Sequence, residues 1–338
     1  MPSKNRMFFN QNSPIMSVVV PLYNEEKVIH QFHSRLNQVI KTLGIKTEVI
    51  YVNDGSKDST AEQIGNLKNL EYSIVLINLS RNFGKEAAMC AGLERVTGDA
   101  TIIIDADLQD PPELIPKMIS AWQEGADVVA MQRSERHGES WFKKTSALLF
   151  YKILNQLADC DIPENVGDFR LLDRKVVIEL IQLREKNIYM KGLLAWPGFN
   201  HVLLPFERDE RFSGDSKWPL KKLIGLAMDG ITSFSTKPLQ IATYLGSAIA
   251  IFAFVYGIGI ILKTLVFGEM VSGFPTIMVA ILALGGFQLL SIGLIGSYIG
   301  RIYNEVKNRP RFIVASQLQK SALDSEKVVS IIANRKEN

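Results

Sequence analysis

Two aspartates, Asp105 and Asp107, follow a continuous apolar run at residues 102–104, and Gln109 stands two residues further on. Side chains that alternate along an extended strand end point the same way, so both carboxylates can approach a single ligand. Carboxylate and amide oxygens are hard ligands that suit Mg²⁺ or Mn²⁺, and such an ion keeps open positions for substrate phosphates. An acidic turn in which Asp110 caps the next helix explains Asp110 but not the two aspartates before it. We therefore expect an anionic, metal-binding site at this point of the chain.

Similar polar clusters end three other apolar runs, at residues 23–25, 53–55 and 80–82. Continuous rather than alternating hydrophobicity is typical of strands buried on both faces, so the pattern predicts an α/β domain with a mostly parallel sheet. Ligands bind such sheets beyond the carboxyl ends of the strands, and the four clusters are thus expected to form one site. The expected strands cover 16–22, 48–54, 72–80, 100–107 and 127–133, and the expected helices cover 25–43, 59–67, 85–96 and 112–124.

The composition excludes several classes of protein and site. The 338 residues carry a net charge of only +3, so neither a disordered polyelectrolyte nor a nucleic-acid-binding protein is indicated. Two cysteines, Cys90 and Cys160, cannot form a disulfide framework or a four-thiolate zinc site. No GxGxxG follows a strand, and Gly84-Lys85 lacks the upstream glycine of a Walker A loop. Neither a dinucleotide-binding fold nor a P-loop is therefore supported, and the 4 histidines match no metal-ligand spacing.

Two stretches, 238–262 and 270–300, contain no ionisable side chain, and each is long enough as a helix to cross a hydrocarbon core of about 30 Å. A helix in a globular core usually shows a polar face, so we expect two transmembrane helices rather than a buried hairpin. Lysines and arginines flank the outer ends of the pair, whereas the loop between them offers only Lys263 against Glu269. The positive-inside rule then places both termini and everything before residue 237 in the cytoplasm. We expect an integral protein of the cytoplasmic (inner) membrane without a signal peptide.

These features predict five parts. They are a polar N-terminal tail at 1–14, a catalytic domain at 15–215, a juxtamembrane helix at 216–236, a two-helix transmembrane domain at 237–300 and a cytoplasmic C-terminal tail at 301–338. The juxtamembrane segment mixes lysines with Trp218 and aliphatic residues, which is typical of an amphipathic helix at the membrane interface, although an ordinary core-facing helix is the alternative. Glycines at 285, 286, 293, 296 and 300 offer close-packing faces, which packing within one chain and homo-oligomerisation explain equally well.

Several motifs resemble those of a known family. The segments PLYNEE (21–26), VNDGSKDST (52–60), LSRNFGKEAAMCAGL (79–93) and DADLQDPPE (105–113) are similar to the signature of family 2 glycosyltransferases with the GT-A fold. The segments GDFRLLDR (167–174), RDERFSGDSKW (208–218), GITSFSTKPL (230–239) and GRIYNEVKNRP (300–310) narrow the resemblance. With two C-terminal spans, the chain most resembles the polyprenyl-phosphate glycosyltransferases, in particular the bactoprenol (undecaprenyl-phosphate) glucosyltransferases, which are related to dolichol-phosphate mannose synthases. The absence of a QxxRW motif argues against a processive polysaccharide synthase.

The resemblance implies a fold and a donor site. The fold would be a Rossmann-like GT-A cytosolic domain followed by an amphipathic interfacial helix and two transmembrane helices. Uridine and ribose would meet Pro21, Tyr23 and Glu25, and Asp54 would accept the imide N–H of uracil. Lys85 would lie near the nucleotide, although an exposed lysine at a helix start is the plain alternative. Asp105 and Ala106 would contact the nucleotide-sugar, and Asp107 and Gln109 would hold a Mg²⁺ or Mn²⁺ ion that offsets charge on the departing UDP.

The acceptor implied by the resemblance is a lipid phosphate. A phosphate monoester has a second pKa of about 6, so its oxygen is already nucleophilic near neutral pH and needs positive charge around it more than a strong base. The resemblance favours Arg133 and Arg211 for that charge. Asp168 would act as base or orienter on the acceptor side, unless it forms a structural pair with Arg170 or Arg174. Arg136, Lys143, Lys144 and Arg208 are further candidates for this charge, and the alternative is that they are simply solvated.

The expected reaction is inverting transfer of a hexose, with glucose favoured, from a UDP-sugar to undecaprenyl phosphate. The products are UDP and polyprenyl-phosphate-sugar, which would serve the modification of cell-envelope glycans. One alternative is the same reaction with mannose, GlcNAc or aminoarabinose. The alternative from another class is a catalytically silent membrane scaffold that binds nucleotide-sugars.

Overall fold

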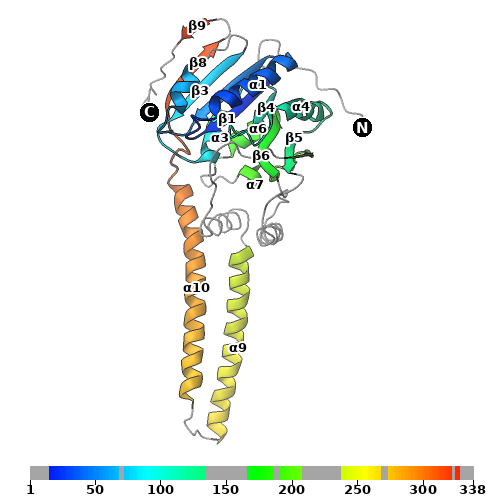
Figure 1. Ribbon diagram of the computed structural model, residues 1–338. Helices are drawn as coiled ribbons and strands as arrows, with labels where there is room; N and C mark the ends of the chain where they lie inside the picture. Colours follow the sequence, from blue (N-terminus) through cyan, green and yellow to red (C-terminus); the bar gives the residue numbers. More distant parts are fainter. Residues whose placement is uncertain are drawn as a thin grey trace, which may run out of the picture. The chain divides into compact units, whose positions relative to one another are not determined.

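The computed structural model describes residues 15–67, 72–133, 166–183, 185, 190–207, 237–267, 273–321 and 324–327. The chain divides into two compact units, and the described residues up to 207 and again from 310 belong to the first (Figure 1). The described residues from 237 to 309 belong to the second unit. The segments expected at 1–14 and 216–236, together with Arg208 and Arg211, lie outside the described residues.

The first unit is built on a nine-stranded sheet of order β7-β5-β6-β4-β1-β2-β3-β8-β9. Its central strands β4, β1, β2 and β3 are mutually parallel, as the continuous apolar runs predict. The antiparallel pairs β4–β6, β5–β6, β3–β8 and β8–β9 were not predicted. The strands are β1 (Met16–Leu22), β2 (Thr47–Asn53), β3 (Ser73–Leu79), β4 (Ala100–Ile103), β5 (Val128–Arg133), β6 (Val166–Asp173), β7 (His201–Phe206), β8 (Val314–Ser321) and β9 (Asp324–Lys327).

Helices cover both faces of this sheet. The apolar residues of α1 recur at helical spacing and are buried against one face with those of α4, together with Val18, Val20 and Tyr51. On the other face α3 lies close to the sheet, because a Cβ at Gly92 would stand 2.3 Å from Cγ1 of Val19. The helices are α1 (Ile29–Leu43), α2 (Thr60–Gly65), α3 (Lys85–Leu93), the 3₁₀ turn η1 (Pro112–Leu114), α4 (Ile115–Gln123), α6 (Arg174–Gln182) and α7 (Met190–Ala195).

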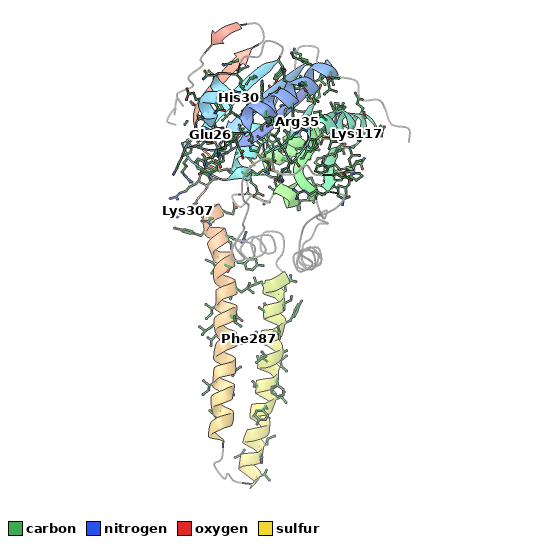
Figure 2. The ribbon with its side chains drawn as sticks, viewed as in Figure 1. Glu26, His30, Arg35, Lys117, Phe287 and Lys307 are labelled. Atoms are coloured by element: carbon green, nitrogen blue, oxygen red, sulfur yellow. The ribbon has the colours of Figure 1, made fainter. Side chains whose placement is uncertain are left out.

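The second unit consists of two long helices, α9 (Lys237–Phe267) and α10 (Phe274–Val306). Within the described side chains, one window, Leu239–Tyr256 in α9, is long and apolar enough to cross a membrane, with a mean hydropathy of 1.7. That a pair of helices spans the membrane therefore stays a prediction. A Cβ at Gly246 would lie 3.8 Å from Phe287, so the two helices approach each other there (Figure 2). The glycines expected to form packing faces in α10 have no described atom within 4 Å of an added Cβ.

Candidate functional site

Two loops that follow β1 and β2 are joined by hydrogen bonds in both directions. The amide of Asn24 donates to Oγ of Ser56 at 3.0 Å, and the amide of Lys57 donates to Oδ1 of Asn24 at 2.9 Å. Asn24 has a φ of 56°, a left-handed conformation that asparagine tolerates better than most residues. The amide of Glu25 also donates to Oγ1 of Thr60 at 2.9 Å. The carboxyl ends of these parallel strands therefore carry one fixed polar surface, beside which Tyr23 is 42% exposed.

Glu26, which is labelled in Figure 2, extends the same connection between the two loops. Its amide donates to Oδ2 of Asp58 at 3.2 Å, and its carboxylate accepts from the hydroxyl of Ser59 at 2.9 Å. Pro21 is buried in β1, where it pairs with Val52. Proline lacks an N–H donor, which this position at the end of the strand tolerates.

Asp54 holds the loop between β3 and α3. Its carboxylate accepts hydrogen bonds from the amides of Phe83 at 2.7 Å and Gly84 at 2.9 Å, and the residue is only 2% exposed. Burial raises the pKa of Asp54, an effect that the two amides and the charge of Arg81 partly offset. The expected contact of this carboxylate with uracil thus has to coexist with its structural role, which the sequence did not predict.

Lys85, the first residue of α3, bridges two carboxylates from neighbouring strands. Its Nζ lies 2.7 Å from Oδ2 of Asp105, just beyond β4, and 2.5 Å from Oδ2 of Asp168 in β6. Burial acts to lower the pKa of Lys85, but the charges of Asp105 and Asp168 outweigh it and raise that pKa. Burial likewise raises the pKa of Asp105, while Lys85 counteracts it. The structure thus brings together Lys85, Asp105 and Asp168, which the sequence analysis assigned separately.

The turn after β4 alternates between accessible and buried residues. Asp105, Asp107 and Gln109 are half-buried, whereas Ala106 and Leu108 are 3% exposed and belong to the core. Leu108 has a φ of 63°, a strained conformation for a leucine that its burial maintains. The amide of Gln109 donates to Oδ1 of Asp107 at 3.1 Å, which fixes the turn.

This acidic edge has the chemistry of a divalent-cation site. Asp105 and Asp168 already converge on one cationic group, the ammonium of Lys85, and Asp107 belongs to the same turn as Asp105. Among the described residues there is no group of three or more His, Cys, Asp or Glu arranged as a metal cage. Mg²⁺ is often bound by one or two carboxylates together with substrate phosphates, so a smaller set of ligands fits such an ion.

Arg133 ends β5 beside Gly167 of β6. A Cβ added at Gly167 would lie 3.7 Å from Nη2 of Arg133, an ordinary contact distance, so the guanidinium lies next to this residue. Arg170, which is 4% exposed, donates from Nη2 to the carbonyl of Gly167 at 2.6 Å. Two arginines therefore approach the residue that precedes Asp168. The sequence predicts Arg170 only as an alternative partner of Asp168, and it indicates no role for Gly167.

Comparisons with known proteins show the family of the chain. The family model described as glycosyl transferase family 2 matches residues 17–181. An uncharacterized glycosyltransferase of Synechocystis is 48% identical over 89% of this chain and 94% of its own length. A bactoprenol glucosyl transferase of Shigella phage SfII is 47% identical over 88% of this chain and 97% of its own length. A prophage bactoprenol glucosyl transferase homolog of Escherichia coli is 46% identical, with 88% and 98% covered.

The solved structures include looser likenesses. Glucosyl-3-phosphoglycerate synthase from Mycobacterium tuberculosis, in complex with Mn²⁺, UDP-glucose and phosphoglyceric acid, superposes with a TM-score of 0.44 and 20% identity. It covers 65% of this chain and 78% of its own.

Proposed function

Because the chain belongs to glycosyl transferase family 2 and is therefore a glycosyltransferase with a GT-A fold, we propose that it transfers glucose from UDP-glucose to undecaprenyl phosphate with inversion. The observation that carries the proposal is that two aspartates converge on Lys85: Asp105 just beyond the carboxyl end of β4, and Asp168 near the amino end of the antiparallel strand β6. This convergence supports a donor side and an acceptor side that lie next to each other.

The donor half is proposed to lie over the linked loops of β1 and β2. Tyr23 and Glu25 would meet the ribose and base, and Asp54 would accept from uracil while it keeps Phe83 and Gly84 in place. Asp105 and Ala106 would orient the sugar. Asp107 and Gln109 would hold a Mg²⁺ or Mn²⁺ ion, which supplies a Lewis acid for the charge on departing UDP.

The acceptor half is proposed to lie beside β5 and β6. Arg133 would neutralise part of the charge on the lipid phosphate and hold its oxygen in line behind the anomeric carbon. Attack from that side forms the new C–O bond as the bond to UDP breaks, which inverts the configuration. Asp168 would orient the phosphate, or accept its proton when the monoester arrives protonated. Arg211 is proposed as a second contact from outside the described residues.

The membrane part of the proposal concerns access to the lipid. The apolar window Leu239–Tyr256 and the charge-free stretch of α10 support a pair of spans. The lysines and arginines that flank the outer ends of the pair support cytoplasmic termini. An amphipathic segment at 216–236 would then meet the bilayer surface, at the depth of the phosphate group. Reporter fusions test this topology: a fusion after residue 312 should score cytoplasmic, and one at residue 268 should score external.

The activity test uses the purified full-length protein with undecaprenyl phosphate and a panel of radiolabelled UDP- and GDP-sugars. We expect glucose to enter the lipid fraction from UDP-glucose, with a β-linked product seen in the coupling constant of the anomeric proton. Asp107→Asn should abolish this transfer, and EDTA should do the same. Transfer from another sugar nucleotide would replace the donor in the proposal, and binding of UDP-sugars without any transfer would favour the silent scaffold.

A further inference from the structure

We infer that the ammonium of Lys85 competes with the divalent ion for the negative charge of the aspartates. The ion then binds tightly only when a nucleoside diphosphate draws Lys85 away from them. The inference rests on the proposed function, because it takes a divalent cation and a diphosphate as ligands of the site around Lys85 and Asp105. It adds an order to their binding, with the chain's own lysine as the cause.

The geometry places Lys85 where a bound cation would be expected. Its Nζ contacts Oδ2 of Asp105 at 2.7 Å and Oδ2 of Asp168 at 2.5 Å, so each aspartate has one oxygen engaged by the ammonium. Two carboxylates on adjacent strands would otherwise repel each other. An ion that used these same oxygens would have to displace the lysine, and an ion on Asp107 would stand close to its positive charge.

The position of Lys85 in its helix makes the contact conditional. A positive side chain at the first position of a helix is disfavoured by the partial positive charge of the helix N-terminus. The two aspartates offset that cost only while they remain free to accept from Lys85. A lysine side chain is a flexible stem with a strongly hydrated point charge, and that of Lys85 is 41% exposed, so it has room to leave.

A diphosphate supplies the alternative partner. Its oxygens carry more negative charge than either aspartate, and Asp54 fixes the Phe83–Gly84 loop that leads directly into Lys85. Once Lys85 turns to the diphosphate, its positive charge leaves the acidic turn, and the ion gains phosphate oxygens beside those of Asp107 and Gln109. Binding of ion and nucleotide is then mutually reinforcing, and linkage requires each to strengthen the other by the same factor.

The test measures Mn²⁺ binding by electron paramagnetic resonance, on the full-length protein in detergent, with and without UDP. Without UDP, Lys85→Met should bind Mn²⁺ at least about tenfold more tightly than wild type, within the usual range of coupling between sites. Lys85→Arg should resemble wild type. Lys117→Met removes the same charge from an exposed position on α4 and should also resemble wild type (Figure 2). UDP should tighten Mn²⁺ binding in both proteins, because its phosphate oxygens also bind the ion, but by a factor about tenfold larger in wild type than in Lys85→Met.

Two results would overturn the inference. One is an equal Mn²⁺ affinity of Lys85→Met and wild type without UDP, with Lys85→Gln as a second variant if the first does not fold. The other is a wild-type affinity for Mn²⁺ that UDP leaves unchanged, a measurement that needs no variant. Sugar transfer is assayed separately, so a protein that shows the coupling but transfers no glucose would refute the proposed function and leave the role of Lys85 standing.

Discussion

The amide of Ser80 donates a 2.9 Å hydrogen bond to the carbonyl oxygen of Ile313. Ser80 opens the loop that leads to Lys85, and Ile313 directly precedes β8, the strand that returns from α10 to the sheet. Arg311 makes a second connection, to the segment between α6 and α7, by donating from Nε to the carbonyl of Glu185 at 2.9 Å. The segment beyond α10 is thus part of the framework that holds the donor side of the site.

Truncation after residue 309 should therefore destabilise the first unit. It removes β8 and β9 and leaves β3 without its antiparallel neighbour, so we expect the melting temperature to fall by about 5–10 °C, as a loss of about 2–3 kcal/mol implies. Near-ultraviolet circular dichroism follows the transition. Truncation after Lys327 keeps both strands and is the matched control; equal melting temperatures for the two would contradict the structural role of β8.

Gly55→Ala should disrupt the packing of the loop after β2 against the loop after β3. Gly55 has a φ of +66°, and an added Cβ would stand 2.4 Å from the backbone carbonyl carbon of Arg81. Backbone cannot move away as a flexible side chain can, so we expect a loss of about 2–4 kcal/mol in the free energy of unfolding. Gly65→Ala, where nothing lies within 4 Å, should be neutral or stabilising. Urea denaturation compares the two, and equal effects would contradict the prediction.

Asp54→Asn should lower both the stability of the folded protein and its affinity for UDP. An amide offers one acceptor where Phe83 and Gly84 need two, so about 1.5–3 kcal/mol of stability should be lost. The loop that carries Lys85 loosens at the same time, and calorimetry should show weaker UDP binding. A loss of UDP affinity at unchanged stability would mean that Asp54 contacts only the base.

His33 should make stability depend on pH. Burial lowers the pKa of His33 to about 4, with the charge of His30 acting in the same direction. The unfolded chain therefore binds a proton at His33 near pH 6.5, whereas the folded chain binds it only near pH 4. Stability consequently falls as the pH drops from about 6.5 to about 4, and this group causes no further loss below that. The full effect is about 3 kcal/mol.

The His33 effect is measured as the difference between wild type and a variant. His33→Asn keeps a polar group near the position of Nδ1, which lies 2.8 Å from the hydroxyl of Tyr51, but cannot titrate. Its stability should depend less on pH between 6.5 and 4 than that of wild type. His30→Gln, on the exposed side of α1, should retain most of the dependence (Figure 2). Parallel curves for His33→Asn and wild type would refute the prediction.

Arg133→Ala should separate the two halves of the proposed site. Loss of a charge-assisted contact to the lipid phosphate should lower transfer by about 1.5–3 kcal/mol of transition-state stabilisation, roughly 10- to 100-fold in rate. UDP affinity should stay near that of wild type, and slow hydrolysis of the donor by water should survive better than transfer. Weakened UDP binding instead would assign Arg133 to the diphosphate.

Sequence reasoning predicted the central strands well because local patterning determines them. The expected strand at 16–22 is β1 to the residue, and β2, β3 and β5 differ from expectation by a residue at their ends. The expected strand at 100–107 ends at Ile103 instead, where its pairing with β1 and β6 stops, and Leu108 turns the backbone further on with its positive φ. Such a turn needs tertiary burial of Leu108, which no local pattern reveals.

The missed features depend on partners far away in the chain. The sequence of β8, VASQLQKS, is too polar to be predicted as a strand. It forms a strand because it pairs with the edge of β3, far earlier in the chain. There Nδ2 of Asn78 donates to Oγ of Ser316, which lies 238 positions later. The contact between Lys85 and Asp168 likewise joins positions 83 apart. The resemblance to the family made both residues site candidates but could not reveal that they meet.

The late position of β8 also has a consequence for biosynthesis. A ribosome completes β3 long before β8, and the two long helices α9 and α10 are made between them. Throughout that interval β3 exposes an unpaired edge, the kind of edge that recruits other chains. The catalytic sheet can close only after α10 has been synthesised, so a nascent chain arrested before residue 314 should be sensitive to proteases and dependent on chaperones.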